Sequence, residues 1–217
     1  MKMRTPYVIA IASAVGLAGV VASLAIAESS KDVPAAGQPE MKLPPGWTME
    51  DMQKFMVAST PGKMQELLAK DAGVWHTKCT MWMAPDTEPI RSEGKSTVTP
   101  IMDGRYTKCE MEGEMPGMGP YHGFAIYGYD NVAKQFVSTW IDNMSTGFAN
   151  GVGQLSDDGK TLTWEFTASC PIAEKPVVMR EIETTTGPNT KTLEMFGTDP
   201  KSGKEFQMMK IEMTRKS

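Results

Sequence analysis

Apolar residues recur three or four positions apart in the stretch that follows Thr48. This spacing is typical of one face of a helix, and Asp51 stands three residues after Thr48, as in a capping box. The apolar positions of this face are Met49, Met52, Phe55 and Met56. A second stretch of this kind begins at Thr60-Pro61, which we expect to be the N-cap and the first helical residue, and it ends before Gly73. The pattern predicts a helical segment over residues 47–72, made of two short helices.

From Trp75 onward the period changes to two, as in half-buried strands. The clearest case is Thr161–Cys170, where apolar residues at even positions alternate with Thr and Glu at odd positions. Runs of this kind are separated by turn residues, at Asp103-Gly104, Asp130-Asn131, Ser156 to Gly159, Gly187 to Asn189 and Asp199 to Gly203. Their spacing predicts about eight to ten strands joined mainly by short loops. No helical pattern intervenes, so we expect a mostly β, antiparallel meander.

A meander of this length has two unpaired edges unless it closes on itself. Closure into an up-and-down β-barrel over residues 73–217 is the most economical solution, and a two-sheet sandwich is the alternative. Gly73-Val74-Trp75 opens the first strand and Arg215 lies near the end of the last strand. If these strands pair, we expect a structural contact in which Arg215 stacks on the Trp75 ring, within about 6 Å.

The first 27 residues are typical of a secretory signal peptide. Lys2 and Arg4 precede an apolar run over residues 7–26, which ends in Ala25-Ile26-Ala27, a cleavage motif. An uncleaved membrane anchor is the alternative, because the run is long enough to span a bilayer. Residues 28–46 are Pro-rich and have the composition of a linker. We therefore expect an exported protein, periplasmic or secreted, that contacts a membrane only through the leader if it is uncleaved.

Charge argues against nucleic acid as a partner. The 217 residues carry 22 basic and 26 acidic side chains, and without the leader 20 basic and 26 acidic ones remain, a net charge of −6. Nucleic-acid binders are basic. Methionine is in excess: the chain has 19, of which 17 follow the leader.

Three cysteines follow the leader, Cys79, Cys109 and Cys170. In an oxidising compartment we expect one structural disulfide and one buried thiol. Three pairings are open, and the spacings do not choose among them. None of the spacings is that of a CxxC redox motif or of a zinc ribbon.

Several motifs along the strands form a recognisable set. The longest runs from Gly123 to Gly147, and the others are Asp103-Gly104-Arg105, Gly117-Met118-Gly119-Pro120 and Thr214-Arg215-Lys216. With these motifs, about residues 60–216 resemble a bacterial family known as domain of unknown function 1579. The resemblance implies a calycin-like, or lipocalin-like, β-barrel that is frequently exported and has no established activity.

The best candidate site is the strand end around Trp140 and Asp142. In a strand that starts at Phe136 these two side chains share one face. If that face points inward, an aromatic ring and a carboxylate line a cavity, as in small-molecule pockets. The alternative is that Asp142 and Thr146 bond backbone groups of the following turn.

The sequence offers little support for catalysis or for metal binding. His76 and His122 are the only histidines, and neither has a second ligand at metal spacing. Asp142 or His122 could act as an acid or base, and this enzyme on the same scaffold is an alternative hypothesis. Three alternating carboxylates belong on a solvated strand face, namely Glu110, Glu112 and Glu114. Phosphate-loop, nucleophile-elbow and HExxH motifs are lacking, so we expect neither a metal nor a cofactor.

The methionines allow three interpretations. Those of the first helices, such as Met49 and Met64, are expected to pack against a core. Met115 and Met118 flank a Pro-Gly flap, and thioethers there would suit an adaptable apolar pocket. Met pairs could instead hold Cu(I) in an exported protein. The leading hypothesis is that the barrel binds a small apolar or amphipathic ligand through Trp140, Asp142, Thr146, Trp164, Met115 and Met118.

Overall fold

A computed structural model describes residues 43–216. The expected signal peptide and most of the expected linker lie outside the described residues. The elements are α1 (Met49–Ser59), α2 (Lys63–Ala69), β1 (Gly73–Met81), β2 (Ile90–Ile101), β3 (Tyr106–Met115), β4 (Gly119–Asp130), β5 (Gln135–Asp142), β6 (Ala149–Leu155), β7 (Thr161–Cys170), β8 (Lys175–Gly187), β9 (Thr190–Thr198) and β10 (Glu205–Arg215).

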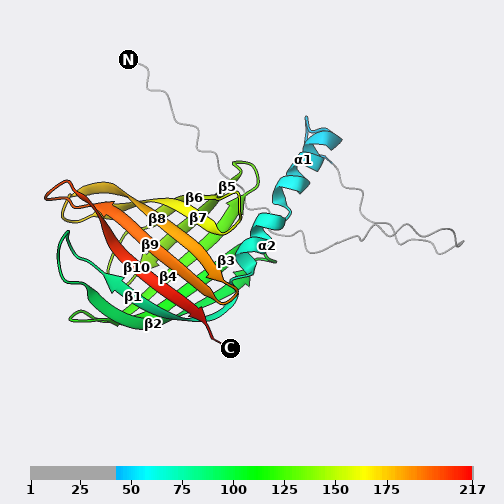
Figure 1. The fold of residues 1–217 in the computed structure, drawn as a ribbon. Helices are drawn as coiled ribbons and strands as arrows, with labels where there is room; N and C mark the ends of the chain where they lie inside the picture. The colour runs from blue at the N-terminus through cyan, green and yellow to red at the C-terminus, as the bar shows by residue number, and fades with distance from the viewer. Residues whose placement is uncertain (1–42, 217) are drawn as a thin grey trace, which may run out of the picture. The chain divides into compact units, whose positions relative to one another are not determined.

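The ten strands form a closed antiparallel barrel in which each strand pairs with its neighbours in the chain and β1 pairs with β10 (Figure 1). This confirms the predicted up-and-down barrel and excludes the sandwich. The inward and outward alternation is clearest in β7, where Leu162, Trp164 and Phe166 are buried and the residues between them are exposed. The period of two in the sequence is therefore the period of the barrel wall.

Closure of the barrel brings Trp75 and Arg215 together. They are register partners in the β1–β10 pair, and the Arg215 guanidinium lies 4.2 Å from the centroid of the Trp75 ring. Nη2 of Arg215 also donates to the carbonyl of Lys70 at 2.9 Å, and Nη1 donates to the carbonyl of Ala72. Arg215 thus joins the last strand to both the first strand and the end of α2, a contact that follows from closure.

The two predicted helices exist, but the start of the second differs from the expectation. Thr48 and Asp51 form the predicted capping box, with the Thr48 amide donating to Asp51 Oδ2 at 2.9 Å. Thr60 is the C-cap of α1, not the N-cap of α2. The N-cap of α2 is Gly62, whose amide donates to Gln65 Oε1 at 2.8 Å. The side chain of Gln65 supplies the cap that we expected from Thr60.

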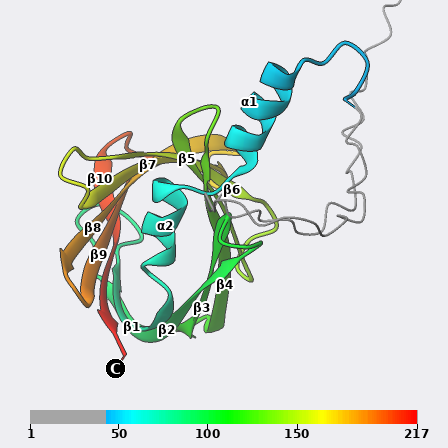
Figure 2. The same ribbon diagram turned by 90° about the vertical axis from the view of Figure 1, so that its right-hand side faces the viewer.

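The apolar face of α1 is uncovered, contrary to the expectation that packing explains its methionines. No residue of α1 is buried, and Met49 is 72% exposed. Figure 2 shows α1 extending away from the barrel, whereas α2 lies at the barrel end. Periodicity identified the helix correctly, but it does not show whether a partner surface exists.

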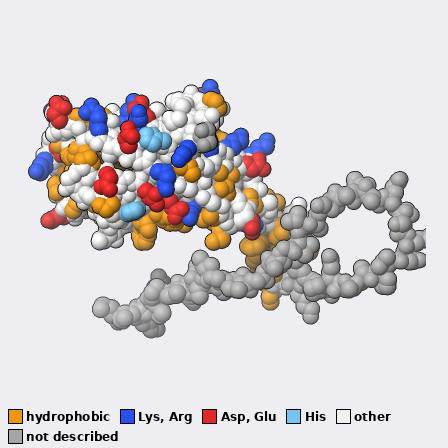
Figure 3. Space-filling model, turned by 90° about the horizontal axis from the view of Figure 1, so that it is seen from below, with side chains coloured by type: hydrophobic (Ala, Val, Ile, Leu, Met, Phe, Trp, Pro, Cys, Tyr) orange, Lys and Arg blue, Asp and Glu red, His pale blue; other side chains and the backbone are white. Residues whose placement is uncertain are grey.

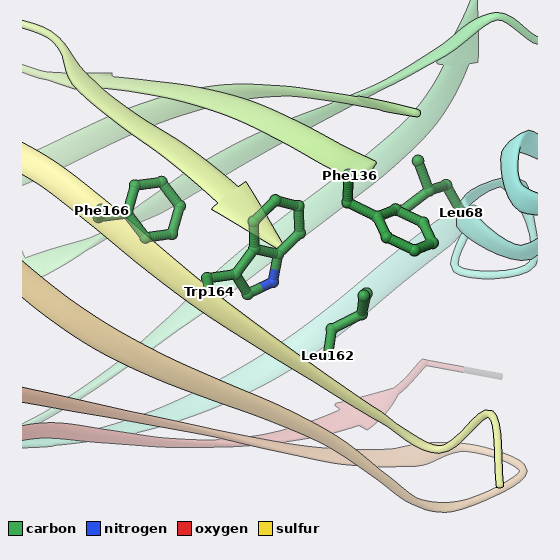
Figure 4. Close-up of a cluster of buried hydrophobic side chains, with 5 residues drawn as sticks. All are labelled: Leu68, Phe136, Leu162, Trp164 and Phe166. Carbon is green, nitrogen blue, oxygen red and sulfur yellow. The ribbon is translucent and has the colours of Figure 1, made fainter. Parts of the chain in front are cut away.

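Helix α2 lies across one end of the barrel. Leu68 of α2 is buried with Phe136 of β5 and Leu162 of β7, and these side chains meet in Figure 4. Nε2 of Gln65 donates to the carbonyl of Tyr129 at 3.0 Å, and Nδ2 of Asn131 donates to the carbonyl of Thr60 at 2.9 Å. Apolar packing and side-chain hydrogen bonds to the β4–β5 turn therefore hold α2 in place.

Two large aromatic rings of β7 fit inside the barrel wall because glycines of β6 lie opposite them. Trp164 and Phe166 of β7 pair with Gly153 and Gly151 of β6. A Cβ at either glycine would come within 2.6 Å of the neighbouring ring. The absence of side chains at these two positions lets the rings lie flat against the β6 backbone.

The expected disulfide is not present. Cys79, Cys109 and Cys170 are all free thiols. Cys79 of β1 is opposite Ser92 of β2, whereas Cys109 of β3 is opposite Val98 of β2. Two strand spacings and the length of β2 from Ser92 to Val98 therefore separate their backbones, by roughly 20 Å. A disulfide needs Cα atoms within about 7 Å, and Cys170 on β7 is in a different part of the barrel wall. The register of the strands therefore separates all three thiols.

Across residues 43–216, neither helix has the length and apolar character needed to cross a membrane.

Candidate functional site

The barrel encloses a cavity of about 960 Å³. Leu68 and Asp71, at the end of α2, line its inner end, and residues 144–148 of the β5–β6 loop line its outer end. We call this outer end the mouth; it is formed by the loops that follow the odd-numbered strands. The volume lies in the range of small-molecule pockets, about 300 to 1,000 Å³.

Methionines account for much of the cavity wall. Eight methionines line the cavity: Met81, Met111, Met115, Met144, Met179, Met195, Met209 and Met213. Unbranched thioethers adapt to irregular shapes and remain apolar. The methionine excess noted in the sequence is therefore concentrated on the inner face of the barrel.

A row of cavity-lining side chains runs across five neighbouring strands. Met81 of β1 is the register partner of Met209 of β10, which is the partner of Met195 of β9. Met195 in turn is opposite Glu181 of β8, and Glu181 is opposite Trp164 of β7. Register partners on one face of a sheet have neighbouring side chains. Three thioethers, a carboxyl group and an indole ring are thus adjacent.

The inner end of the cavity carries a buried ion cluster, which we call the floor cluster: Asp71, Glu183 and Lys191. The ammonium of Lys191 contacts both carboxylates, and Lys191 is only 9% exposed. Burial alone would lower the pKa of Lys191, but Glu183 and Asp71 outweigh it and raise the pKa above its usual value. Burial raises the pKa of Asp71, and Lys191 offsets this only in part. Lys191 is therefore charged, with both carboxylates as partners.

Glu181 is a fourth ionisable group beside the floor cluster, but it has no partner. It is 4% exposed, and its Oε1 atom makes no hydrogen bond within the described chain. Burial, with a smaller contribution from Glu183, raises the pKa of Glu181 to about 8. The indole Nε1 of Trp164, its register partner, is also buried without a hydrogen bond. An unused acceptor and an unused donor thus lie on neighbouring strands at the cavity wall.

Trp140 and Asp142 line the cavity near its mouth. The indole Nε1 of Trp140 donates to Asp142 Oδ2 at 2.9 Å, and the Met144 amide donates to Asp142 Oδ1 at 2.9 Å. Asp142 therefore lines the cavity and also bonds the following turn, and whether it contacts a ligand stays a prediction. Burial, and next the charge of Asp142, raise the pKa of the nearby Tyr121 hydroxyl.

The remaining predicted ligand contacts divide between the cavity and the surface. Trp164 and Met115 line the cavity, and Thr146 lies at its outer end. Met118 does not line the cavity, and it is 60% exposed at the tip of the β3–β4 turn. Of the two methionines expected at the flap, Met115 therefore lines the cavity and Met118 does not. Whether these side chains contact a ligand stays a prediction.

The histidines and the alternating glutamates face outward. Both histidine side chains lie on the outer surface among acidic and basic groups (Figure 3). His122 bonds Asn143 through its main chain: its amide donates to Asn143 Oδ1 at 2.9 Å, and its carbonyl accepts from the Asn143 amide at 3.0 Å. His76 Nε2 lies 3.3 Å from Glu93. Glu110, Glu112 and Glu114 are exposed as expected. Of the two residues considered as an acid or base, Asp142 therefore lines the cavity and His122 does not.

Sequence reasoning missed the floor cluster and Glu181. Two carboxyl groups alternate at Glu181 and Glu183 just as they do at Glu110 and Glu112, yet the first pair faces inward and the second pair faces solvent. No local pattern separates the two cases, because Lys191 and Asp71 come together across 120 positions of sequence. Within residues 43–216, no group of three or more His, Cys, Asp or Glu side chains is arranged to hold a metal ion.

A closed up-and-down barrel with a helix over one end and a large internal cavity defines a calycin-like protein. The chain belongs to the family described as Protein of unknown function (DUF1579), which matches residues 60–215.

Two solved structures are similar in fold. Rv2717c from M. tuberculosis superposes with a TM-score of 0.53 at 10% identity, over 73% of this chain and 100% of that one. The S-type phycobiliprotein lyase CPES from Guillardia theta superposes with a TM-score of 0.52 at 9% identity, over 72% of this chain and 94% of that one. A comparison with curated proteins finds no match. At these identities the likeness concerns the fold alone.

Proposed function

We propose that this protein binds a small apolar or amphipathic molecule inside the barrel, without converting it. The observation that carries the proposal is the cavity of about 960 Å³, which a barrel built only for stability would fill with side chains. Its wall is rich in thioethers and aromatic rings, and a few polar groups converge at its inner end. This is the composition of pockets that bind ligands mainly by burial and orient them with a few hydrogen bonds.

The experiment is titration with a neutral fluorescent apolar probe, N-phenyl-1-naphthylamine, and its displacement by aliphatic amphiphiles. The informative pair of variants is Ala168→Trp and Thr167→Trp on β7. Ala168 lines the cavity, whereas Thr167 is exposed on the outer face. We expect Ala168→Trp to weaken probe binding by about tenfold or more, because the added ring occupies the ligand volume, about 1.4 kcal/mol in binding. Thr167→Trp should bind as wild type does.

The proposal fails if the wild-type protein binds neither the probe nor any of the amphiphiles. It also fails if both tryptophan variants weaken binding equally, since the probe would then bind outside the barrel. Near-UV circular dichroism of both variants establishes that the barrel is intact before binding is compared.

We further propose that the protein acts outside the cytoplasm. The support is the leader of residues 1–27, with Lys2 and Arg4 before an apolar run and an Ala25-Ile26-Ala27 motif. The intact mass of the protein recovered from its own host tests this. Cleavage predicts a chain that begins at Glu28, and a full-length chain in the cytoplasmic fraction would contradict export.

Binding of Cu(I) by thioethers is a second candidate function. The row of Met81, Met209 and Met195 on neighbouring strands favours it, because thioethers select soft cations such as Cu(I). Native mass spectrometry with Ag(I) tests it directly. Met209→Leu should abolish retention of one ion, whereas Met102→Leu, at an exposed turn, should not. If the wild-type protein retains no ion, this function is excluded.

A further inference from the structure

We propose that the ligand is an amphiphile with a cationic amine head, and that the head binds at Glu181 at the inner end of the cavity, with the apolar tail toward the mouth. This inference rests on the proposed function and adds the chemical class of the ligand. The starting observation is that Glu181 is 4% exposed, lines the cavity and has an Oε1 atom without a hydrogen-bond partner among the described residues.

A buried carboxyl group without a partner is costly for the folded protein. Leaving a buried acceptor unsatisfied costs about 1 to 3 kcal/mol, and more when the group is charged. Nearly all buried polar groups in native proteins are bonded, so the exceptions commonly mark sites where a ligand supplies the missing bond. The ligand group that completes Glu181 is therefore a hydrogen-bond donor.

The charges at the inner end favour a cation. Three carboxyl groups lie there with one ammonium, and the ammonium of Lys191 is already engaged by Asp71 and Glu183. The charge of Arg215 lowers the pKa of Asp71, but its guanidinium stacks on Trp75 and donates to main-chain carbonyls at the end of α2, so it is not a partner of Glu181. An anionic head, such as that of a fatty acid, would face excess negative charge without a free cation. A cationic head would meet the one carboxyl group that has no partner.

The aromatic rings beside Glu181 also suit a cation. Trp164 is the register partner of Glu181, and the ring centroids of Trp164 and Tyr127 lie 5.6 Å apart. Figure 4 shows Trp164 between Phe166 and Phe136 in the interior of the barrel. The electron-rich faces of indole and phenol rings attract cations, by about 2 kcal/mol or more when both groups are desolvated. Trp164 and Tyr127 both line the cavity, so a cation bound at Glu181 would lie beside aromatic rings.

The length of the cavity accounts for the apolar tail. The wall between Glu181 and the mouth includes Met115, Met179 and Trp140. The loop residue Phe148 extends this apolar surface at the outer end. A primary amine without a chain would leave most of the cavity unfilled, so the matching ligand is a long-chain amine and not a small cation.

Ionisation of Glu181 makes the binding of an amine dependent on pH. Burial raises the pKa of Glu181 to about 8, so the empty site is protonated at neutral pH. A cation binds the carboxylate, so binding releases this proton. Affinity should rise with pH up to about 8, by at most about tenfold per unit, and then level off.

Three of the other titratable groups near Glu181 keep one charge state between pH 6 and pH 8, namely Cys109, Tyr127 and Lys191. The groups that face the same part of the cavity are Asp71, Cys109, Tyr127, Glu183 and Lys191. Burial raises the pKa of Cys109 to about 11, and burial raises the pKa of Tyr127 well above its usual value, so both side chains stay neutral. Lys191 stays charged, because its carboxylate partners raise its pKa. A primary alkyl amine also stays charged, since its pKa is about 10.

The test compares three amphiphiles of equal chain length as competitors of N-phenyl-1-naphthylamine: decylammonium, decanol and decanoate, all below their micellar concentrations. At pH 7.5 we expect decylammonium to displace the probe at a concentration about tenfold or more below that of the other two. This advantage should grow between pH 6 and pH 8. Glu181→Gln should remove the advantage and its pH dependence, while decanol binding stays unchanged.

The matched control is Glu165→Gln on β7. Glu165 is exposed on the outer face, where its register partner is Arg180. This variant removes the same charge from the protein without touching the cavity, so it should keep the advantage of decylammonium. The pH series on the wild-type protein is independent of any variant.

The outcomes separate the inference from the proposed function. If all three amphiphiles bind equally, or decanoate binds best, the amine head is wrong while ligand binding stands. If decylammonium keeps its advantage in Glu181→Gln, the head binds elsewhere and the assignment to Glu181 is overturned. If neither the probe nor any amphiphile binds, the proposed function fails and the inference fails with it.

Discussion

Removal of Lys191 should destabilise the barrel more than any other single charge deletion at its inner end. Lys191 is 9% exposed and is the cation that contacts both Asp71 and Glu183. Substitution by methionine keeps most of the side-chain volume and removes the charge. Two partly buried carboxylates, with side chains 29% and 16% exposed, then lose their shared partner, and breaking a buried ion pair in this way typically costs about 3 to 5 kcal/mol.

The cost of protonating a carboxyl group gives an independent estimate of this loss of stability. The variant can relieve the unpaired charge by protonating one carboxyl group. Protonating a free carboxyl group, with a reference pKa of about 4, costs about 4 kcal/mol at pH 7 and about 1 kcal/mol at pH 5. The loss of stability in Lys191→Met should therefore be about 4 kcal/mol at pH 7 and should shrink as the pH falls to 5. For a domain of this size, about 4 kcal/mol lowers Tm by about 8 to 16 °C.

The assay is urea unfolding followed by tryptophan fluorescence at pH 7 and pH 5. The control is Lys95→Met on β2. The ammonium of Lys95 lies 2.8 Å from Glu112 on the outer surface, where both side chains are about half exposed. Surface pairs of this kind contribute at most about 1 kcal/mol. A loss in Lys191→Met no larger than that in Lys95→Met, or an equal loss at both pH values, would refute the account of the floor cluster.

Three further predictions concern Glu181, barrel closure and the cavity wall. The folded pKa of about 8 for Glu181 exceeds its ordinary value of 4.5, so its contribution to stability is complete below about pH 4.5 and is lost as the pH rises to 8. Relative to Glu181→Gln, the free protein should thus lose about 4 kcal/mol between pH 5 and pH 8 in urea unfolding, and a constant difference would contradict the buried site. Arg215→Ala should lower the free energy of unfolding by about 2 to 4 kcal/mol, because it removes a cation–π contact and hydrogen bonds to the end of α2. Arg180→Ala, which removes the cation–π contact of an exposed arginine, should lose under about 1 kcal/mol by the same measurement, and equal losses would contradict the closure argument. Gly123→Ala would place a Cβ against the Trp140 ring, so it should cost about 1 to 3 kcal/mol and shift the emission of that tryptophan; unchanged stability and emission would mean that the ring is not held at this position.

The predictable part of the fold is the part encoded by local periodicity. Thr161–Cys170 alternates in sequence and alternates in burial, and the Thr48 cap forms as its spacing predicts. Trp75 and Arg215 could be paired without a structure, because closure of a meander must bring the first and last strands together. Each of these inferences needs only the period of a strand, the geometry of a helix start, or topology.

The part that could not be predicted depends on which face of a strand is inside and on contacts between distant residues. Glu181 lies inside and Glu112 lies outside, although both belong to the same alternating pattern of carboxylates. The face is set by the register of the whole barrel, which no short segment contains. The uncovered apolar face of α1 could not be predicted for a similar reason, because periodicity predicts a helix but does not show whether another surface packs against its apolar face. Likewise, the cysteine count could not show that β2 separates Cys79 from Cys109.

Helix α2 lies over one end of the barrel, so different parts of the chain line the two ends of the cavity. Leu68 and Asp71 line the inner end, so on the proposed binding mode a ligand would enter through the mouth and its head would be the first group to reach Glu181. Its tail would then lie against loops such as residues 144–148, which line the outer end but do not contribute to the floor cluster. On that proposal, substitutions in the mouth loops would alter the choice of tail and leave the binding of the head unchanged.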